Sequence, residues 1–174
     1  PFKNDYLSYY ADAVYGKAEA FFFLKDYSSA IKICDNYLKL NVIYTDKFLK
    51  LKGNCLINLQ EFSSAITILK KVVALQDKNS HQFSQSLLIL AKAYLGNKDL
   101  NNAEKVFIQV WPILQSIKSS NDPWIVYYHE IYGQLLMAKA EKDSCEYHKL
   151  ANYTEAVEIF DKALQLNPLS DNHQ

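Results

Sequence analysis

The stretch NYTEAVEIFDKALQLNP at residues 152–168 occurs in altered form three times earlier in the chain. The related stretches are DYSSAIKICDNYLKLN at 26–41, EFSSAITILKKVVALQ at 61–76 and DLNNAEKVFIQVWPIL at 99–114. When the four are superposed on one shared alanine, successive copies lie 35, 38 and 53 residues apart, at Ala30, Ala65, Ala103 and Ala156. A period in this range is typical of stacked helical pairs. The pattern therefore predicts a chain of repeated helical units.

Large side chains keep fixed distances from each of these alanines. Three residues before the alanine stand Tyr27, Phe62, Leu100 and Tyr153, and four residues after it stand Cys34, Leu69, Phe107 and Phe160. Offsets of three and four place side chains on one face of a helix. In the first three copies a small residue stands twelve positions earlier, namely Ala18, Gly53 and Ala91. Two helices cross closely only where one side chain is small, so each copy is predicted to be an antiparallel helix pair.

The links between the predicted helices are short and polar, as such hairpins require: KDYSS at 25–29, QEFSS at 60–64 and NKDLNN at 97–102. The whole arrangement resembles the tetratricopeptide repeat family, which has small residues at two fixed positions of a paired-helix unit. The resemblance implies an all-α fold, an α-solenoid of antiparallel helix pairs in a right-handed superhelix. It also implies one domain over residues 1–174, with four repeats at about 11–44, 46–79, 84–118 and 126–169.

Two departures from the regular repeat stand out. Pro112 falls inside the second helix of the third repeat, where it is expected to kink or end that helix and to begin a bent connection. In the fourth repeat Gly133 is the expected small residue, but Ala156 follows 23 positions later. The extra residues, KAEKDSCEYHK near 139–149, either lengthen the first helix or form a loop.

NYT at 152–154 matches a glycosylation acceptor, yet it is interpreted as a helix start with Asn152 or Thr154 near the cap.

The composition bounds the kind of protein. Of the 174 residues 49% are hydrophobic and 22% charged, with 19 basic and 19 acidic side chains, so no net charge attracts nucleic acid or an anionic membrane. The longest apolar run is much shorter than the roughly 20 residues of a membrane span. Three scattered cysteines indicate a reducing compartment, cytoplasmic or nuclear. The missing initiator methionine suggests a piece of a longer protein.

The resemblance implies that the first helices of the repeats line a concave groove, at about the second, fifth, ninth and twelfth positions of each repeat. The groove residues predicted for repeats one and two are Asp12, Tyr15, Glu19, Phe22, Lys47, Lys50, Asn54 and Ile57. Those predicted for repeats three and four are Gln85, Leu88, Lys92, Leu95, Tyr127, Glu130, Gln134 and Met137. Lysines in the middle and aromatic residues among them suit an extended peptide or helix with an acidic centre and apolar anchors.

The predicted function is therefore that of a non-catalytic protein–protein interaction scaffold, with another protein as partner and no nucleic acid or membrane. The alternative is a structural module of a multisubunit complex that packs or dimerises through its edges, in which case the groove lysines are a solvated surface. No cofactor is expected, because the glycines stand alone and Cys145 with His148 lacks a second ligand pair for zinc.

The resemblance also allows a sharper hypothesis, a clamp for the terminal carboxylate of a heat-shock chaperone. Lys50 and Asn54 fit the first two places of that clamp. Ile89, Tyr127 and Ile131 stand where Asn, Lys and Arg are needed. Since a carboxylate requires several convergent donors, a chaperone-tail site is disfavoured.

Overall fold

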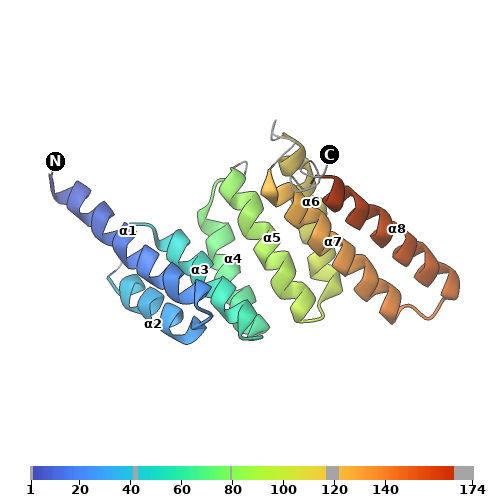
Figure 1. The fold of residues 1–174 in the computed structure, drawn as a ribbon, viewed down its shortest axis with the longest axis horizontal. Coiled ribbons are helices and arrows are strands. Elements are labelled where there is room, and N and C mark those ends of the chain that lie inside the picture. The colour runs from blue at the N-terminus through green and yellow to red at the C-terminus, as the bar shows by residue number, and fades with distance from the viewer. Residues whose placement is uncertain (1, 41–42, 79, 117–121, 167–174) are drawn as a thin grey trace, which may run out of the picture. The chain divides into compact units, whose positions relative to one another are not determined.

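The computed structural model describes residues 2–40, 43–78, 80–116 and 122–166. Within these ranges the chain is helical and has no strand (Figure 1). The described helices are α1 (Phe2–Phe23), α2 (Tyr27–Leu38), α3 (Thr45–Asn58), α4 (Phe62–Leu75), α5 (His81–Gly96), α6 (Leu100–Ser116), α7 (Pro123–Lys142) and α8 (Glu146–Gln165). They pack in consecutive pairs, so the prediction of an all-α repeat fold is confirmed.

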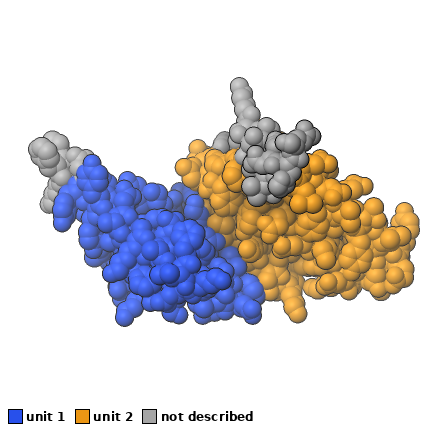
Figure 2. Space-filling view, in the orientation of Figure 1, with its two compact units in different colours: residues 1–76 blue, residues 77–174 orange. Residues whose placement is uncertain are grey.

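The chain divides into two compact units, residues 1–76 and residues 77–174 (Figure 2). The first unit contains α1 to α4, and the second contains α5 to α8. In each unit the second helix of one pair also packs on the first helix of the next pair, α2 on α3 and α6 on α7. Each unit is thus two stacked hairpins.

Three of the four hairpin links share one backbone geometry. The middle residue of each link has a positive φ, 62° at Lys25, 61° at Gln60 and 59° at Lys98. At the first of these links, Asp26 N–H donates to Phe21 O at 2.9 Å, and Lys25 N–H donates to Phe22 O at 3.0 Å. This pair of bonds satisfies the last carbonyls of the helix and turns the chain sharply into the next one. The repeated link explains why the second helix of each pair begins at the same offset.

The small residues lie where the helices of a pair cross. A Cβ added to Gly53 of α3 would come within 2.7 Å of Leu69 Cδ2 in α4. One added to Gly133 of α7 would come within 2.6 Å of Phe160 Cζ in α8. Leu69 and Phe160 occupy the same offset from their repeat alanines, so the two crossings are equivalent. The sequence prediction of closely packed pairs is confirmed at both.

The core of the first unit includes two free thiols and a stack of aromatic rings. Cys34 and Cys55 are fully buried, and burial raises their pKa to about 12 and about 11. Tyr37 of α2 stacks on Phe48 of α3 with ring centroids 3.8 Å apart. These contacts hold the first hairpin against the second.

Of the two predicted effects of Pro112, a kink or an end of the helix, the end does not occur, because α6 continues to Ser116. The missing proline N–H removes one backbone hydrogen bond, but side chains on either side keep this turn packed. Val110 and Leu114 are fully buried, and Trp111 stacks on Tyr128 of α7 at 4.7 Å. Tertiary packing therefore outweighs the local cost of proline. Residues 117–121 of the predicted bent connection lie outside the described residues.

The extra residues of the fourth repeat lengthen both of its helices. Residues 139–142 complete α7, residues 146–149 begin α8, and three residues join them. The expectation of a helix start near Asn152 or Thr154 is wrong, since α8 begins six residues earlier, at Glu146. Thr154 lies inside the helix, where its Oγ1 donates to Leu150 O at 2.9 Å.

Candidate functional site

The predicted groove residues lie on the first helix of each pair, two helices to a unit. We describe them as two surfaces, the α1–α3 face of the first unit and the α5–α7 face of the second. The α1–α3 face consists of Asp12, Tyr15, Glu19, Phe22, Lys47, Lys50 and Asn54. The α5–α7 face consists of Gln85, Lys92, Tyr127, Glu130 and Gln134.

Lys47 is the centre of the α1–α3 face. Its Nζ lies 3.9 Å from Asp12 Oδ1, and it stands over the rings of Tyr15 at 5.9 Å and Tyr44 at 4.6 Å. Tyr15 also packs its ring edge-on against Phe48 at 5.5 Å. The structure therefore brings residues from α1 and α3 together around one ammonium group.

Partial burial distinguishes this face from a fully hydrated one. Burial, followed by the nearby Glu19 carboxylate, raises the pKa of Tyr15 to about 12. Burial also lowers the pKa of Lys50, because an ammonium group loses hydration there. A partner carboxylate that reached Lys50 would interact in a less polar surrounding than bulk water provides, so the interaction would be stronger.

On the α5–α7 face a cation lies beside an apolar hollow. Lys92 Nζ of α5 stands 5.7 Å from the ring centroid of Tyr127 in α7. Trp124 packs edge-on against Tyr127 at 5.3 Å, and these two rings with Pro123 line an open hollow of about 310 Å³. Burial raises the pKa of Tyr127 far above its ordinary value, so the phenol stays neutral. One turn further along α7, Gln134 Nε2 donates to Glu130 Oε1 at 3.3 Å.

Two predicted groove residues belong to the core. Leu88 of α5 is fully buried, and Ile57 of α3 is 7% exposed, so the predictions of a groove position for both are wrong. The register of a helix gives the direction of a side chain but not the number of elements that pack around it. Two of the positions at which a chaperone-tail clamp needs a polar donor are occupied by Ile89 and Ile131, and both side chains are buried.

Sequence reasoning missed a polar contact between the starts of α5 and α7. His81 Nε2 lies 3.4 Å from Asp122 Oδ2, and Asp122 Oδ1 caps α7 by accepting from Trp124 N–H at 2.8 Å. Asp before Pro at a helix start is a recognisable cap signal, but its partner on another helix has no local signal.

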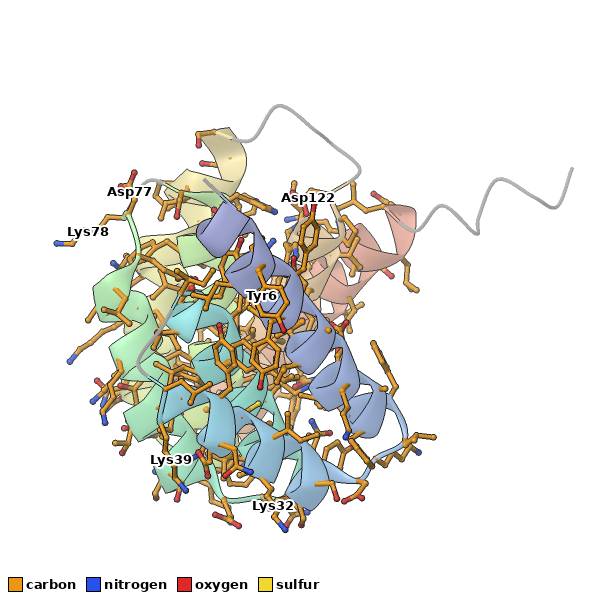
Figure 3. All side chains as sticks on the ribbon, turned by 90° about the vertical axis from the view of Figure 1, so that its left-hand side faces the viewer. Tyr6, Lys32, Lys39, Asp77, Lys78 and Asp122 are labelled. Carbon is orange, nitrogen blue, oxygen red and sulfur yellow. The ribbon has the colours of Figure 1, made fainter. Side chains whose placement is uncertain are left out.

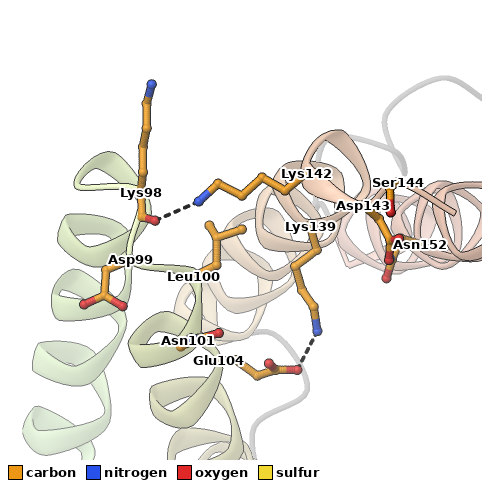
Figure 4. A pocket seen from close by; sticks show the side chains of 10 residues that line it. All are labelled: Lys98, Asp99, Leu100, Asn101, Glu104, Lys139, Lys142, Asp143, Ser144 and Asn152. Carbon is orange, nitrogen blue, oxygen red and sulfur yellow. Dashed lines mark hydrogen bonds and ion pairs between the residues drawn. The ribbon is translucent and has the colours of Figure 1, made fainter.

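A second hollow lies at the hairpin tips of the second unit, away from the predicted faces (Figure 4). It measures about 550 Å³, and Lys139 Nζ bonds Glu104 Oε1 within it at 2.7 Å. Lys142 Nζ donates to Lys98 O at 3.1 Å, as the dashed lines of Figure 4 show. These bonds tie α7 to the α5–α6 hairpin, so we assign the hollow a structural role.

Cys145 and His148 lie near the α7–α8 link, and His148 Nδ1 is 3.4 Å from Asp143 Oδ2. Among the described residues no group of three or more His, Cys, Asp or Glu side chains is placed to hold a metal ion. No described helix is both long enough and apolar enough to cross a membrane.

The fold and its repeated crossings define a class, the all-α proteins built of tetratricopeptide-type helix pairs. The family model described as "Tetratricopeptide repeat" matches residues 144–168, which contain the stretch that opened the sequence analysis. The predicted resemblance to that family is confirmed in sequence for this repeat, and the helix pairs of the fold agree with it. Curated protein sequences give no significant match.

Solved structures share the fold over most of the chain. MamA from Desulfovibrio magneticus RS-1 superposes with a TM-score of 0.65 at 22% identity, covering 92% of this chain and 77% of its own. A Podosopora anserina protein named as a kinesin light chain with nearly identical TPR-like repeats has a TM-score of 0.59 at 14% identity. That match covers 92% of this chain and 96% of the other. At these identities the likeness extends to the fold alone.

Proposed function

We propose that the chain is a non-catalytic scaffold for protein–protein interaction whose first helices bind a segment of a partner protein. The observation that carries this proposal is the pairing of Lys92 with the hollow lined by Pro123, Trp124 and Tyr127. An ammonium group beside an aromatic hollow suits an acidic residue next to a large apolar side chain. Aromatic anchors contribute most of the affinity in such sites, and charges set the register.

The α1–α3 face supports the same chemistry in the first unit. Lys47 is exposed between two tyrosine rings, and the partly buried Lys50 lies one turn further along α3. Helix pairs present such surfaces already formed, so binding orders the partner and little of the scaffold. The partner is therefore an extended or helical segment with acidic and apolar residues.

Selection from a library of displayed random peptides tests this proposal on the chain of residues 1–174. We expect enriched peptides to place Asp or Glu close to Trp, Phe or Leu. Binding of an enriched peptide, followed by fluorescence anisotropy, should weaken about tenfold with Lys92→Met and more with Lys92→Glu. The α1–α3 face is tested in the same way with Lys47→Glu.

Lys105→Glu is the matched control, since Lys105 is exposed on α6, the second helix of its pair. It makes the same change in charge in the same unit and should leave the affinity unchanged. Equal loss of binding in Lys92→Glu and Lys105→Glu would show only a general charge effect. Unchanged binding in the Lys92 and Lys47 variants would refute the proposal.

A further inference from the structure

The outer side of α1 is an apolar helix face without a covering element among the described residues. Tyr6, Tyr9 and Phe23 are about three-quarters exposed along it, at 73%, 74% and 73% (Figure 3 labels Tyr6). Between them lie Ala13 and Gly16, both exposed, and a Cβ added to Gly16 would meet nothing within 4 Å. Large residues at the ends and small ones in the middle leave room for another helix.

The outer side of α8 is similarly open. Val157 is 60% exposed and Leu164 is 64% exposed, and Tyr153 and Asp161 lie on the same part of the helix surface. Ala156 and Ile159 point the other way, into the contact with α7. In the helix order α8 is a second helix of a pair, and α1 is a first helix.

The first unit shows how a second helix packs on a first helix. At the α2–α3 junction Lys52 Nζ binds Asp35 Oδ1 at 2.5 Å, and Tyr27 Oη donates to Asn58 Oδ1 at 3.3 Å. The ion pair and the hydrogen bond are two contacts by which this junction sets its register.

The second unit has the same kind of junction between α6 and α7. Lys139 Nζ binds Glu104 Oε1 at 2.7 Å, and Trp111 stacks on Tyr128. Relative to the small residues of the helices, this ion pair occupies different positions from Lys52 and Asp35. Each junction therefore gives a pair of helix positions that lie in contact. The corresponding positions on α1 and α8 can be found by counting from the small residue of each helix.

The small residues of the helices give the correspondence. Ala18 of α1 matches Gly53 and Gly133, and Ala156 of α8 matches Ala30 and Ala103. By this register Lys52 corresponds to Lys17, and Asp35 corresponds to Asp161. An ion pair inside the chain thus has oppositely charged equivalents on α1 and α8.

The residues of α1 and α8 at the other corresponding positions also have similar chemistry to each other. Lys139 and Glu104 correspond to Leu24 and Val157, two exposed apolar residues. Tyr27 and Asn58 correspond to Tyr153 and Phe23, two aromatic residues. In the transferred geometry Lys17 would thus face Asp161, and apolar or aromatic side chains of α1 would face apolar or aromatic side chains of α8. The apolar and aromatic pairs replace polar pairs of the junctions inside the chain.

We propose that α8 of one copy of the chain docks on α1 of the next copy, in the geometry of the α2–α3 junction, with Asp161 and Lys17 as the ion pair. Both side chains are exposed, and within the described residues neither has an ion-pair partner. Because the two surfaces differ, the contact is head to tail and does not close into a symmetric dimer. Copies then add one after another as the concentration rises.

Sedimentation equilibrium of residues 1–174 at low salt, over a wide range of concentration, tests the proposal. We expect the average mass to rise steadily beyond that of a dimer. Lys17→Glu alone and Asp161→Lys alone should each abolish the rise, because like charges then face each other. The double variant Lys17→Glu with Asp161→Lys should restore it, as should an equimolar mixture of the two single variants.

Exposed residues elsewhere provide the controls. Lys32→Glu on α2 and Glu141→Lys on α7 make the same charge changes away from both surfaces and should leave the rise intact. A monomer at every concentration would overturn the proposal. A dimer sensitive to Lys17→Glu but not to Asp161→Lys would also overturn it, since that result indicates contact between two α1 helices. Circular dichroism confirms that each variant is folded.

Discussion

At the scale of single residues, His129 of α7 is an ionisable side chain within an apolar contact. It is 6% exposed, packs against Trp111 with ring centroids 5.6 Å apart, and its Nδ1 has no hydrogen-bond partner among the described residues. Burial, and secondly the charge of Lys162, lowers its pKa below the ordinary value. The folded chain therefore favours the neutral imidazole.

This shift makes stability depend on pH in a defined direction. The unfolded chain takes up the proton first, near pH 6.5, so the free energy of unfolding should fall as the pH drops below about 6.5. The decrease reaches at most about 1.4 kcal/mol per pH unit for one proton and stops at the folded-state pKa. Urea unfolding at about pH 7.5 and about pH 5.5 measures it.

His129→Phe removes the titrating group and keeps an aromatic ring beside Trp111. We expect its unfolding free energy to change less between the two pH values than that of the parent chain. If both proteins lose the same stability on acidification, His129 is not the responsible group.

Within the helices, alanine substitutions at two glycines should change the unfolding free energy in opposite directions. Gly16 lies on the open side of α1, so Gly16→Ala should raise the unfolding free energy by about 0.5–1 kcal/mol through helix propensity alone. Gly53 lies at the α3–α4 crossing, where an added methyl meets the fully buried Leu69 at 2.7 Å. Overpacking there costs about 1–3 kcal/mol, so Gly53→Ala should be destabilising.

Thermal unfolding of both variants beside the parent chain checks these expectations. A stabilising Gly53→Ala would show that the α3–α4 crossing is looser than described. At concentrations too low for copies of the chain to associate, a destabilising Gly16→Ala would mean that another part of the same chain covers the outer side of α1.

The helix pairs could be predicted because each depends on residues a fixed distance apart. The offset between Gly53 and Leu69 is a local signal for a crossing, and the structure has that contact. The behaviour of Pro112 could not be predicted in this way, because Tyr128, a residue of the next helix, keeps that turn packed. The start of α8 could not be predicted for a different reason: the polar residues before Asn152 fit either a longer first helix or a loop, whereas in the structure they begin the second helix.

The candidate site was predictable to the same extent. The repeat register assigned Lys47 and Tyr15 to one groove from different helices, and in the structure Lys47 Nζ lies 5.9 Å from the Tyr15 ring. It failed at Leu88, because a position on one helix does not reveal how many other elements cover it.

At the scale of the whole molecule, the chain carries two kinds of surface. The α1–α3 and α5–α7 faces combine lysines with aromatic rings and suit a partner segment. The outer sides of α1 and α8 are apolar with one complementary charge each and suit another copy of the chain. The two proposals use different residues, so one can fail while the other holds.

Binding of a partner segment by the first helices can be followed by titrating an isotope-labelled chain with a selected peptide and recording amide and side-chain NMR signals. We expect shift changes concentrated at the α1–α3 or α5–α7 face, with Lys47 or Lys92 among the residues most affected. Changes confined to α2, α4, α6 and α8, with both faces unaffected, would contradict it.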